Sequence, residues 1–113
     1  MSIRDQIRKG STEVIILTLL DERSMYGYEM VQELTRRSNG YFEMKEGLLY
    51  PTLHRMQQSG WLSSSWKSVD SRRRKYYTLT AQGREILGEQ AAEWNDFLKN
   101  LAAFLQAKGL WTK

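Results

Sequence analysis

The stretch SRRRKYYTLT at residues 71–80 joins four consecutive cations directly to a run that favours a strand. From residue 62 to residue 79, side chains alternate at a period of two, which is typical of β-strands. Residues 69–72 interrupt this alternation as a turn, so the segment predicts a β-hairpin. Tyr77 and Leu79 would anchor its second strand in the core. The cations would extend beyond the core: Arg72, Arg73, Arg74 and Lys75.

Three helical regions precede the hairpin. Ser11 or Thr12 can cap a helix over residues 14–20, after a shorter helical segment at residues 3–9. The order helix, helix, helix, hairpin predicts a mainly α fold with a small β-hairpin, the winged helix-turn-helix. The later two helices are indicated by apolar faces, one made of Tyr28, Val31 and Leu34 and one made of Leu49, Leu53 and Met56.

A long C-terminal helix is expected after the hairpin. Thr80 can cap it, and it would run to about Lys108, which divides the chain into a winged-helix domain at residues 1–79 and a dimerisation helix with its tail at 80–113. Apolar side chains step by three and four along it, as in a seam for a partner helix. Packing along its own domain would account for the first two turns only, so we expect a homodimer. The expected interface is Ile3, Ile7, Leu87, Trp94, Phe97, Leu101 and Phe104.

Charge is distributed unevenly along the chain, whose net charge is +4. Residues 1–79 hold 13 Lys and Arg against 9 Asp and Glu, whereas residues 80–113 hold 4 of each sign. All the excess positive charge therefore lies in the first part, which indicates a polyanion-binding part and a neutral part with another task. Arg36 and Arg37 fit ordinary surface charges.

Composition argues against an enzyme. The 113 residues include no cysteine and one histidine, His54, so a histidine or cysteine metal cluster, a cysteine nucleophile and a Ser-His-Asp triad are not expected. The sequence contains no glycine-rich phosphate loop, and no cofactor is expected. No apolar run approaches the ~18 residues that span a membrane, and residues 1–10 lack the apolar region of a secretion signal, so none is expected. We therefore expect a cytoplasmic protein without a membrane partner.

In combination, five elements of the chain resemble the PadR family of bacterial transcriptional repressors: GSTEVIILTLL, MYGYEM, EGLLYPTLHRMQQSGWL, SRRRKYYTLTAQG and Trp94. The resemblance covers residues 10–100 and fits the small PadR proteins that have a single long C-terminal helix. It implies a homodimeric winged-helix repressor that binds an inverted-repeat operator in double-stranded DNA and releases it when an effector binds.

The resemblance also implies roles for single residues. The helix that begins near residues 46–47 would be the recognition helix, and Tyr26 resembles a position that touches the DNA backbone. Each role has an alternative: Tyr26 can pack against the hairpin, Tyr50 can be a partly buried structural tyrosine, His54 can be a surface residue, and the cations can form a solvated loop. The expected DNA-contacting residues are Tyr26, Lys45, Tyr50, Thr52, His54, Arg72, Arg73, Arg74 and Lys75.

Trp94 is the expected effector-binding residue, together with Ala91 and Leu98. Some small PadR proteins hold flat aromatic ligands between two such tryptophans, and the small neighbours of Trp94 would leave room around its indole ring. The alternative is a tryptophan that only packs the dimer core. A second function also stays open, in which the winged helix is a protein-interaction module and its basic hairpin meets an acidic partner.

Overall fold

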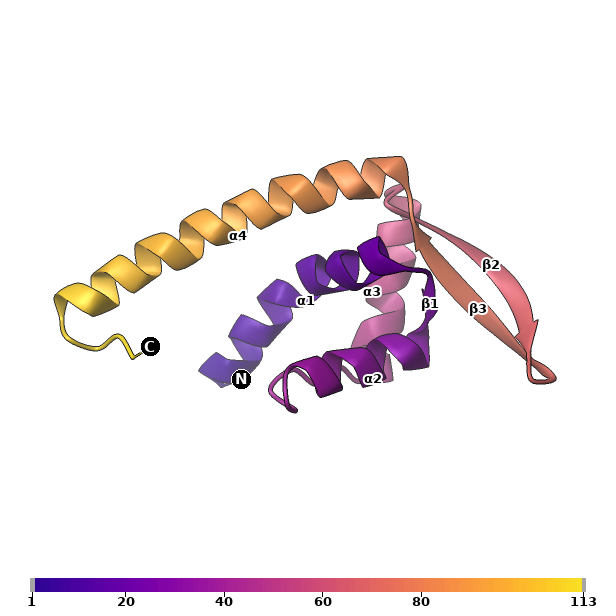
Figure 1. Ribbon diagram of the computed structural model, residues 1–113, viewed down its shortest axis with the longest axis horizontal. Coiled ribbons are helices and arrows are strands. Elements are labelled where there is room, and N and C mark those ends of the chain that lie inside the picture. The colour runs from indigo at the N-terminus through magenta and orange to yellow at the C-terminus, as the bar shows by residue number, and fades with distance from the viewer. Residues whose placement is uncertain (1, 113) are drawn as a thin grey trace.

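The computed structural model describes residues 2–112 and confirms a mainly helical winged-helix fold with a small antiparallel sheet (Figure 1). Met1 and Lys113, the outer limits of the two predicted parts, lie outside the described residues. Three helices gather at the base of the sheet, the hairpin points away from them, and the last helix extends in the other direction. The elements are α1 (Ile3–Glu22), β1 (Met25–Tyr26), α2 (Gly27–Arg37), α3 (Glu46–Gln58), β2 (Leu62–Val69), β3 (Arg72–Leu79) and α4 (Ala81–Ala107).

The first helix is continuous, so the predicted break before residue 14 is wrong. Ser2 caps α1 by accepting a hydrogen bond from the Asp5 amide at 3.1 Å. Ser11 and Thr12 are buried inside the helix, where their hydroxyls donate to the Arg8 carbonyl, each at 3.1 Å. A Ser or Thr hydroxyl can be satisfied by a carbonyl one turn earlier as well as by a helix end, which is why the sequence pattern was ambiguous.

The core lies where α1 and α3 meet the base of the sheet. Ile16 and Leu17 of α1 are completely buried. Leu49, Leu53 and Met56 of α3 are also completely buried, which confirms the predicted inward face of this helix. Each of these side chains contributes roughly 1.5–3 kcal/mol through burial.

The inward face of α2 differs from the prediction. Met30 and Leu34 are buried, and Val31 packs beside them, but Tyr28 is 57% exposed. Two residues along a helix correspond to a rotation of about 200°, so a helix that buries Met30 turns Tyr28 to the opposite side. This places the Tyr28 ring on the outer surface of α2.

The hairpin is confirmed, with a two-residue turn. Val69 pairs with Arg72, and both turn residues, Asp70 and Ser71, have positive φ angles of 51° and 65°. Two central residues with positive φ match the right-handed twist of hairpin strands. A third strand, β1, pairs with β3 to give the order β1-β3-β2, with Tyr26 opposite Tyr76. At two residues, β1 is too short to show a periodicity in the sequence.

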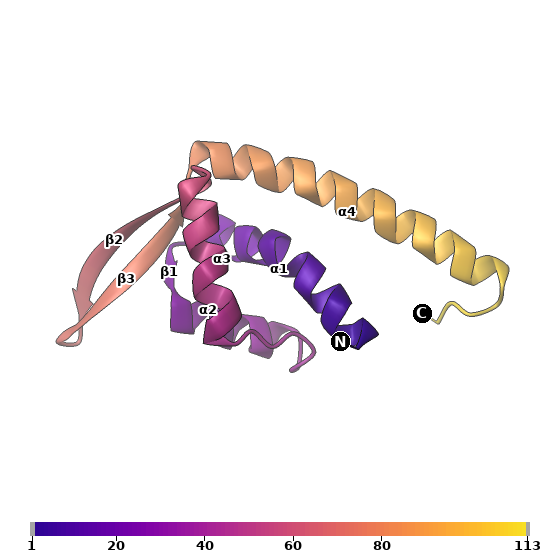
Figure 2. The same ribbon diagram turned by 180° about the vertical axis from the view of Figure 1, so that it is seen from behind.

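The start of α4 is fixed to the end of α3 by close backbone packing. The Thr80 hydroxyl accepts a hydrogen bond from the Gly83 amide at 3.0 Å, which confirms the predicted cap. The same hydroxyl donates a hydrogen bond to the Gly60 carbonyl at 2.7 Å. A Cβ at Gly83 would lie 2.1 Å from the carbonyl oxygen of Trp61, so only glycine fits here. From this fixed start, α4 runs past α1 and beyond the rest of the fold (Figure 2).

Candidate nucleic-acid interface

The outer surface of α3 carries three of the four side chains expected there. Lys45, Tyr50 and His54 are exposed, whereas Thr52 is buried, at 3% exposure. Thr52 lies three residues after Leu49 and therefore on the inward side of the helix. Its hydroxyl donates to the Leu48 carbonyl at 2.8 Å, which satisfies it without solvent. The expectation that Thr52 faces DNA is wrong.

Tyr50 is partly buried, as its structural alternative predicted, and its exposed part leaves the DNA contact a prediction. Its ring lies against Gly27 at the start of α2, where a Cβ would come within 2.6 Å of the Tyr50 hydroxyl oxygen. The side chain nevertheless stays 45% exposed. Partial burial, aided by the negative charge of Glu46, raises the pKa of Tyr50 above its ordinary value. The exposed hydroxyl can donate or accept a hydrogen bond.

The N-terminus of α3 carries a charge of each sign, from Lys45 at the cap and from Glu46 in the first turn. Lys45 is the cap residue, and its side chain makes no capping hydrogen bond. Its backbone carbonyl accepts from the amides of Leu48 and Leu49, at 3.0 and 2.9 Å. The first-turn amide groups of a helix carry partial positive charge and suit a phosphate oxygen, which the Lys45 ammonium group would reinforce.

The β2–β3 hairpin, residues 62–79, is the wing. Four of its five basic side chains lie over aromatic rings, and Arg72 is the exception. Arg74 lies over the Tyr26 ring with 4.3 Å from guanidinium carbon to ring centre, and Tyr26 meets Tyr76 edge-on at 5.4 Å between ring centres. Tyr26 thus packs against the wing, as its alternative predicted. Three more pairs follow the same pattern: Arg73 over Trp66 at 5.2 Å, Lys67 over Tyr76 at 5.0 Å and Lys75 over Tyr77 at 5.5 Å.

A groove separates the wing from α3 and the start of α2. The structure brings five of the expected site residues to this groove: Tyr26, Tyr50, Arg73, Arg74 and Lys75. Lys45, His54 and Arg72 lie on the surface outside the groove lining. Sequence reasoning missed Tyr28 and Trp66, which also line it. For Trp66, the alternation of β2 showed that it shares a face with Leu62, but its place opposite Lys75 needed the strand register.

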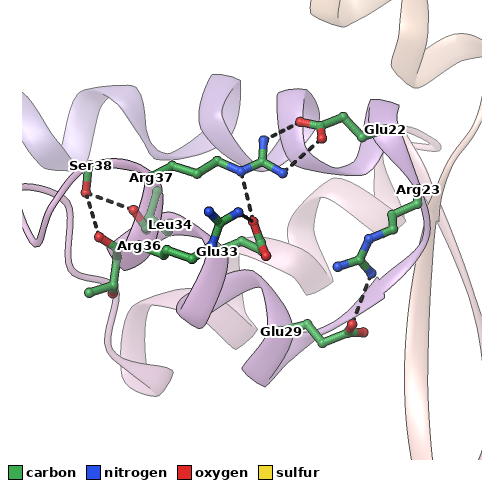
Figure 3. A network of polar contacts seen from close by, with 9 residues as sticks. Glu22, Arg23, Glu29, Glu33, Leu34, Arg36, Arg37 and Ser38 are labelled. Atoms are coloured by element: carbon green, nitrogen blue, oxygen red, sulfur yellow. Dashed lines mark hydrogen bonds and ion pairs between the residues drawn. The ribbon is translucent and has the colours of Figure 1, made fainter.

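Arg36 and Arg37 lie away from this groove, in a polar network that joins α1 to α2 (Figure 3). Arg37 pairs with Glu22 of α1 and, at 2.9 Å, with Glu33 of its own helix. The Arg37 hydrogen bond holds the pKa of Glu22 below its ordinary value, and hydrogen bonds from Arg36 and Arg37 do the same for Glu33. Arg55 of α3 pairs similarly with Glu13 of α1, at 2.8 Å. These surface ion pairs link α2 and α3 to α1, whose packing is set by the buried core.

The residues expected at the dimer interface and the effector site are partly buried in some cases and exposed in others. Leu87 packs partly against the chain's own core, so the expectation that it belongs to a partner-facing seam is not supported by its surroundings. Trp94 is half-buried and meets Phe97 edge-on at 5.6 Å, beside a shallow hollow. Ala91 is half-buried and Leu98 is exposed on the same helix. The remaining expected interface side chains are all exposed: Ile3, Ile7, Phe97, Leu101 and Phe104.

The sequence profile described as "Transcriptional regulator PadR-like family" matches residues 16–89, from the core of α1 through the wing into α4. The chain belongs to this PadR-like family. Its members are transcriptional regulators and not enzymes, so the α3 surface and the wing lie on a DNA-binding regulator.

Relatives and solved structures agree with this PadR-like assignment. The chain is 33% identical to "Uncharacterized protein X" of Lysinibacillus sphaericus, over 92% of this chain and 96% of that one. It is 36% identical to the transcriptional regulator Rv3488 of Mycobacterium tuberculosis, over 74% of this chain and 76% of that one. The structure resembles a PadR-like transcriptional regulator of Bacillus cereus with a TM-score of 0.79 and 31% identity, covering 89% of this chain and 97% of that one.

The structure was also searched for metal sites and for helices that could span a membrane. Among residues 2–112, no group of three or more His, Asp or Glu side chains is placed to hold a metal ion. Over the same residues, no helix has both the length and the hydropathy that crossing a membrane requires.

Proposed function

We propose that this PadR-like regulator is a homodimeric repressor that binds an inverted-repeat operator through α3 and the wing. The observation that carries the proposal is the groove in which α3, the start of α2 and the wing meet. Cations of the wing and the exposed rings of Tyr50 and Trp66 lie along the same groove. Such a surface suits a DNA backbone, which offers both negative phosphates and apolar sugar edges.

Dimerisation is supported by an apolar stripe that the chain itself leaves uncovered. The stripe lies on α4, where Phe97, Leu101 and Phe104 are 54%, 43% and 77% exposed, and Ile3 of α1 is 75% exposed as well. Burying a large apolar side chain stabilises a protein by roughly 1.5–3 kcal/mol, so leaving several exposed on one helix is unfavourable. A second copy, related by a two-fold axis, would cover α4 with its own α4 and α1. In this division of labour, residues 1–79 bind DNA and residues 80–113 hold the two copies together.

The inverted repeat follows from this symmetry. Two copies related by a two-fold axis present two α3 helices in opposite orientations, so each reads one half of a palindromic site. Half-sites about one helical turn apart, roughly 34 Å, would place both α3 helices on one side of the duplex. The proposed place of action is the cytoplasm, where operator DNA is accessible.

The proposed effector is a small planar aromatic compound held near Trp94, with Ala91 and Leu98 beside it. The half-buried indole and the hollow between Trp94 and Phe97 support this proposal. In the dimer two such hollows would face each other across the two α4 helices. A ligand there would change the spacing of the helices and, with it, the spacing of the two wings and α3 helices.

The proposal is tested on the DNA upstream of the chain's own coding region. Nuclease protection by the purified protein is expected to cover an inverted repeat, with two protomers bound per site. Binding of one protomer, or protection without an inverted repeat, would contradict the dimeric arrangement. No protection at any operator-like sequence, together with capture of an acidic protein partner, would favour the interaction module instead.

A further inference from the structure

The four consecutive cations of the wing do not share one surface. Residues paired across two strands have side chains on the same face of the sheet, and successive residues alternate between faces. Tyr77 pairs with Met25, and both are buried, so this pair marks the core-facing side of the sheet. Arg73 and Lys75 are on the same face as Tyr77, because each is an even number of residues from it.

This first face continues the surface of α3. Trp66 pairs with Lys75, and Arg73 lies over the Trp66 ring. Trp66 is 58% exposed and lines the groove opposite Tyr50. Beyond the core, therefore, the face that packs on α3 at its base presents Arg73, Lys75 and Trp66 towards whatever α3 binds.

The second face is braced by aromatic rings. Tyr26 pairs with Tyr76, and Lys67 pairs with Arg74, so all four side chains lie on the side away from the core. Lys67 lies over Tyr76, Tyr76 meets Tyr26, and Arg74 lies over Tyr26. Arg74 also lines the groove, beside Tyr26, and its guanidinium group lies over the Tyr26 ring at 4.3 Å.

Tyr26 connects this stack of side chains to α2. Tyr26 is the residue before α2, and its amide donates to Glu29 of the first turn at 3.2 Å. Glu29 is in turn paired with Arg23 at 3.0 Å, so the backbone of Tyr26 is held at the start of α2. A guanidinium group stacked on this ring ties the middle of the wing to α2.

We infer that Arg73 and Lys75 are the wing residues that contact DNA phosphates, and that Arg74 is a positioning residue that sets the angle of the wing by stacking on Tyr26. This inference rests on the proposed DNA-binding function and divides the basic run by role. The charge of Arg74 contributes through the ring beneath it and not through a phosphate contact.

The test measures affinity for mixed-sequence duplex DNA over a range of salt concentrations, which needs no known operator. Arg73→Ala and Lys75→Ala are each expected to make the slope of log K against log salt shallower by about 0.9 for every phosphate that the variant no longer neutralises. Arg74→Ala is expected to leave the slope as it is and to lower affinity about two- to five-fold at every salt concentration, the size of an exposed cation–π contact. Arg74→Lys, which keeps a cation over the ring, is expected to restore most of that affinity.

A second readout separates positioning from a general effect on folding. Tyr26→Leu removes the ring, so its effect on DNA affinity and that of Arg74→Ala are expected not to add in the double variant. Tyr26→Phe keeps the ring and is expected to keep the coupling to Arg74. A slope change in Arg74→Ala equal to that in Arg73→Ala, or additive effects of Arg74→Ala and Tyr26→Leu, would overturn the inference. If the parent protein does not bind duplex DNA at all, the proposed function itself fails, which is a distinct result.

Discussion

The Tyr50 hydroxyl oxygen lies 2.6 Å from the position that a Cβ on Gly27 would occupy. The first residue of α2 and the outward face of α3 are thus in direct contact, and the absence of a side chain at position 27 allows Tyr50 its place. This contact links the packing of the helix pair to the surface proposed for DNA binding. It also makes Gly27 a position where a single methyl group tests the geometry.

Gly27→Ala is expected to push the Tyr50 ring outward and to destabilise the fold by about 1–3 kcal/mol through overpacking. DNA affinity should fall as well, because the hydroxyl of Tyr50 moves. Gly47→Ala is the matched control for stability, since a Cβ there meets nothing within 4 Å. Urea unfolding of both variants checks the prediction, and equal stability in the two would contradict it.

Gly83→Ala is expected to be more damaging than Gly27→Ala, at about 3 kcal/mol or more, because the obstacle is backbone. The new Cβ would meet the Trp61 carbonyl oxygen, which cannot rotate away as a side chain can. Gly88→Ala, also on α4, has open space and should stabilise the protein by about 0.4–1 kcal/mol. Thermal unfolding would measure both, and a tolerated Gly83→Ala would show that α4 does not start where the structure places it.

Phe97→Asp and Leu101→Asp are expected to convert the dimer to a monomer, because each places a charge on the apolar stripe of α4. Operator affinity should fall about 10²-fold or more once the two half-sites lose their linkage. Lys99→Gln changes the net charge by the same amount on the opposite side of the helix, two residues or about 200° from both Phe97 and Leu101, and should leave the dimer intact. Sedimentation at micromolar concentration decides the matter, and a monomeric parent protein would refute the dimer.

Arg37 is expected to contribute to the acid sensitivity of the fold. The pKa values of Glu22 and Glu33 are lower in the folded chain than in the unfolded one, where a Glu titrates near about 4.3. Their contribution to stability is therefore present above that pH and is lost as the pH falls through the lower folded pKa values. Arg37→Gln should be less stable than the parent at neutral pH and should lose less stability on acidification. Denaturant midpoints measured across this range test the sign, with Lys99→Gln as a charge-matched control on α4.

Trp94→Ala is expected to abolish both the quenching of indole emission by a planar aromatic effector and the release of operator DNA by that compound. The unliganded variant should still bind DNA. Because coupling between two sites is reciprocal, operator DNA should weaken effector binding to the parent protein by the same factor. If no planar aromatic compound quenches the parent and Trp94→Ala only dissociates the dimer, Trp94 is a packing residue.

The parts of the fold with a strong period were predictable from the sequence. The i, i+4, i+7 spacing of Leu49, Leu53 and Met56 indicated the inward face of α3, and the alternation before Leu79 indicated the wing. Thr52 was not predictable in the same way, since its polarity suggests solvent while its carbonyl partner on Leu48 allows burial. For the same reason, Ser11 and Thr12 could be mistaken for caps, although they lie inside the continuous helix α1.

The different roles of residues 72–75 could not be assigned without the strand register. Four cations in sequence look equivalent, and only the pairing of Trp66 with Lys75 and of Lys67 with Arg74 assigns them to two faces. That register depends on the two-residue turn, whose length was not resolved within the four residues expected to form it. The stacking of Arg74 on Tyr26 depends further on β1, a strand that has no periodic signal of its own.

Specific reading of a DNA site by α3 and the wing is tested by comparing two duplexes. The affinity of the purified protein for the inverted repeat in its own promoter is compared with its affinity for a scrambled duplex of the same length, at one physiological salt concentration. The inverted repeat is expected to bind at least ~10³-fold more tightly. Equal affinity for the two duplexes, or no binding to either, would contradict this expectation.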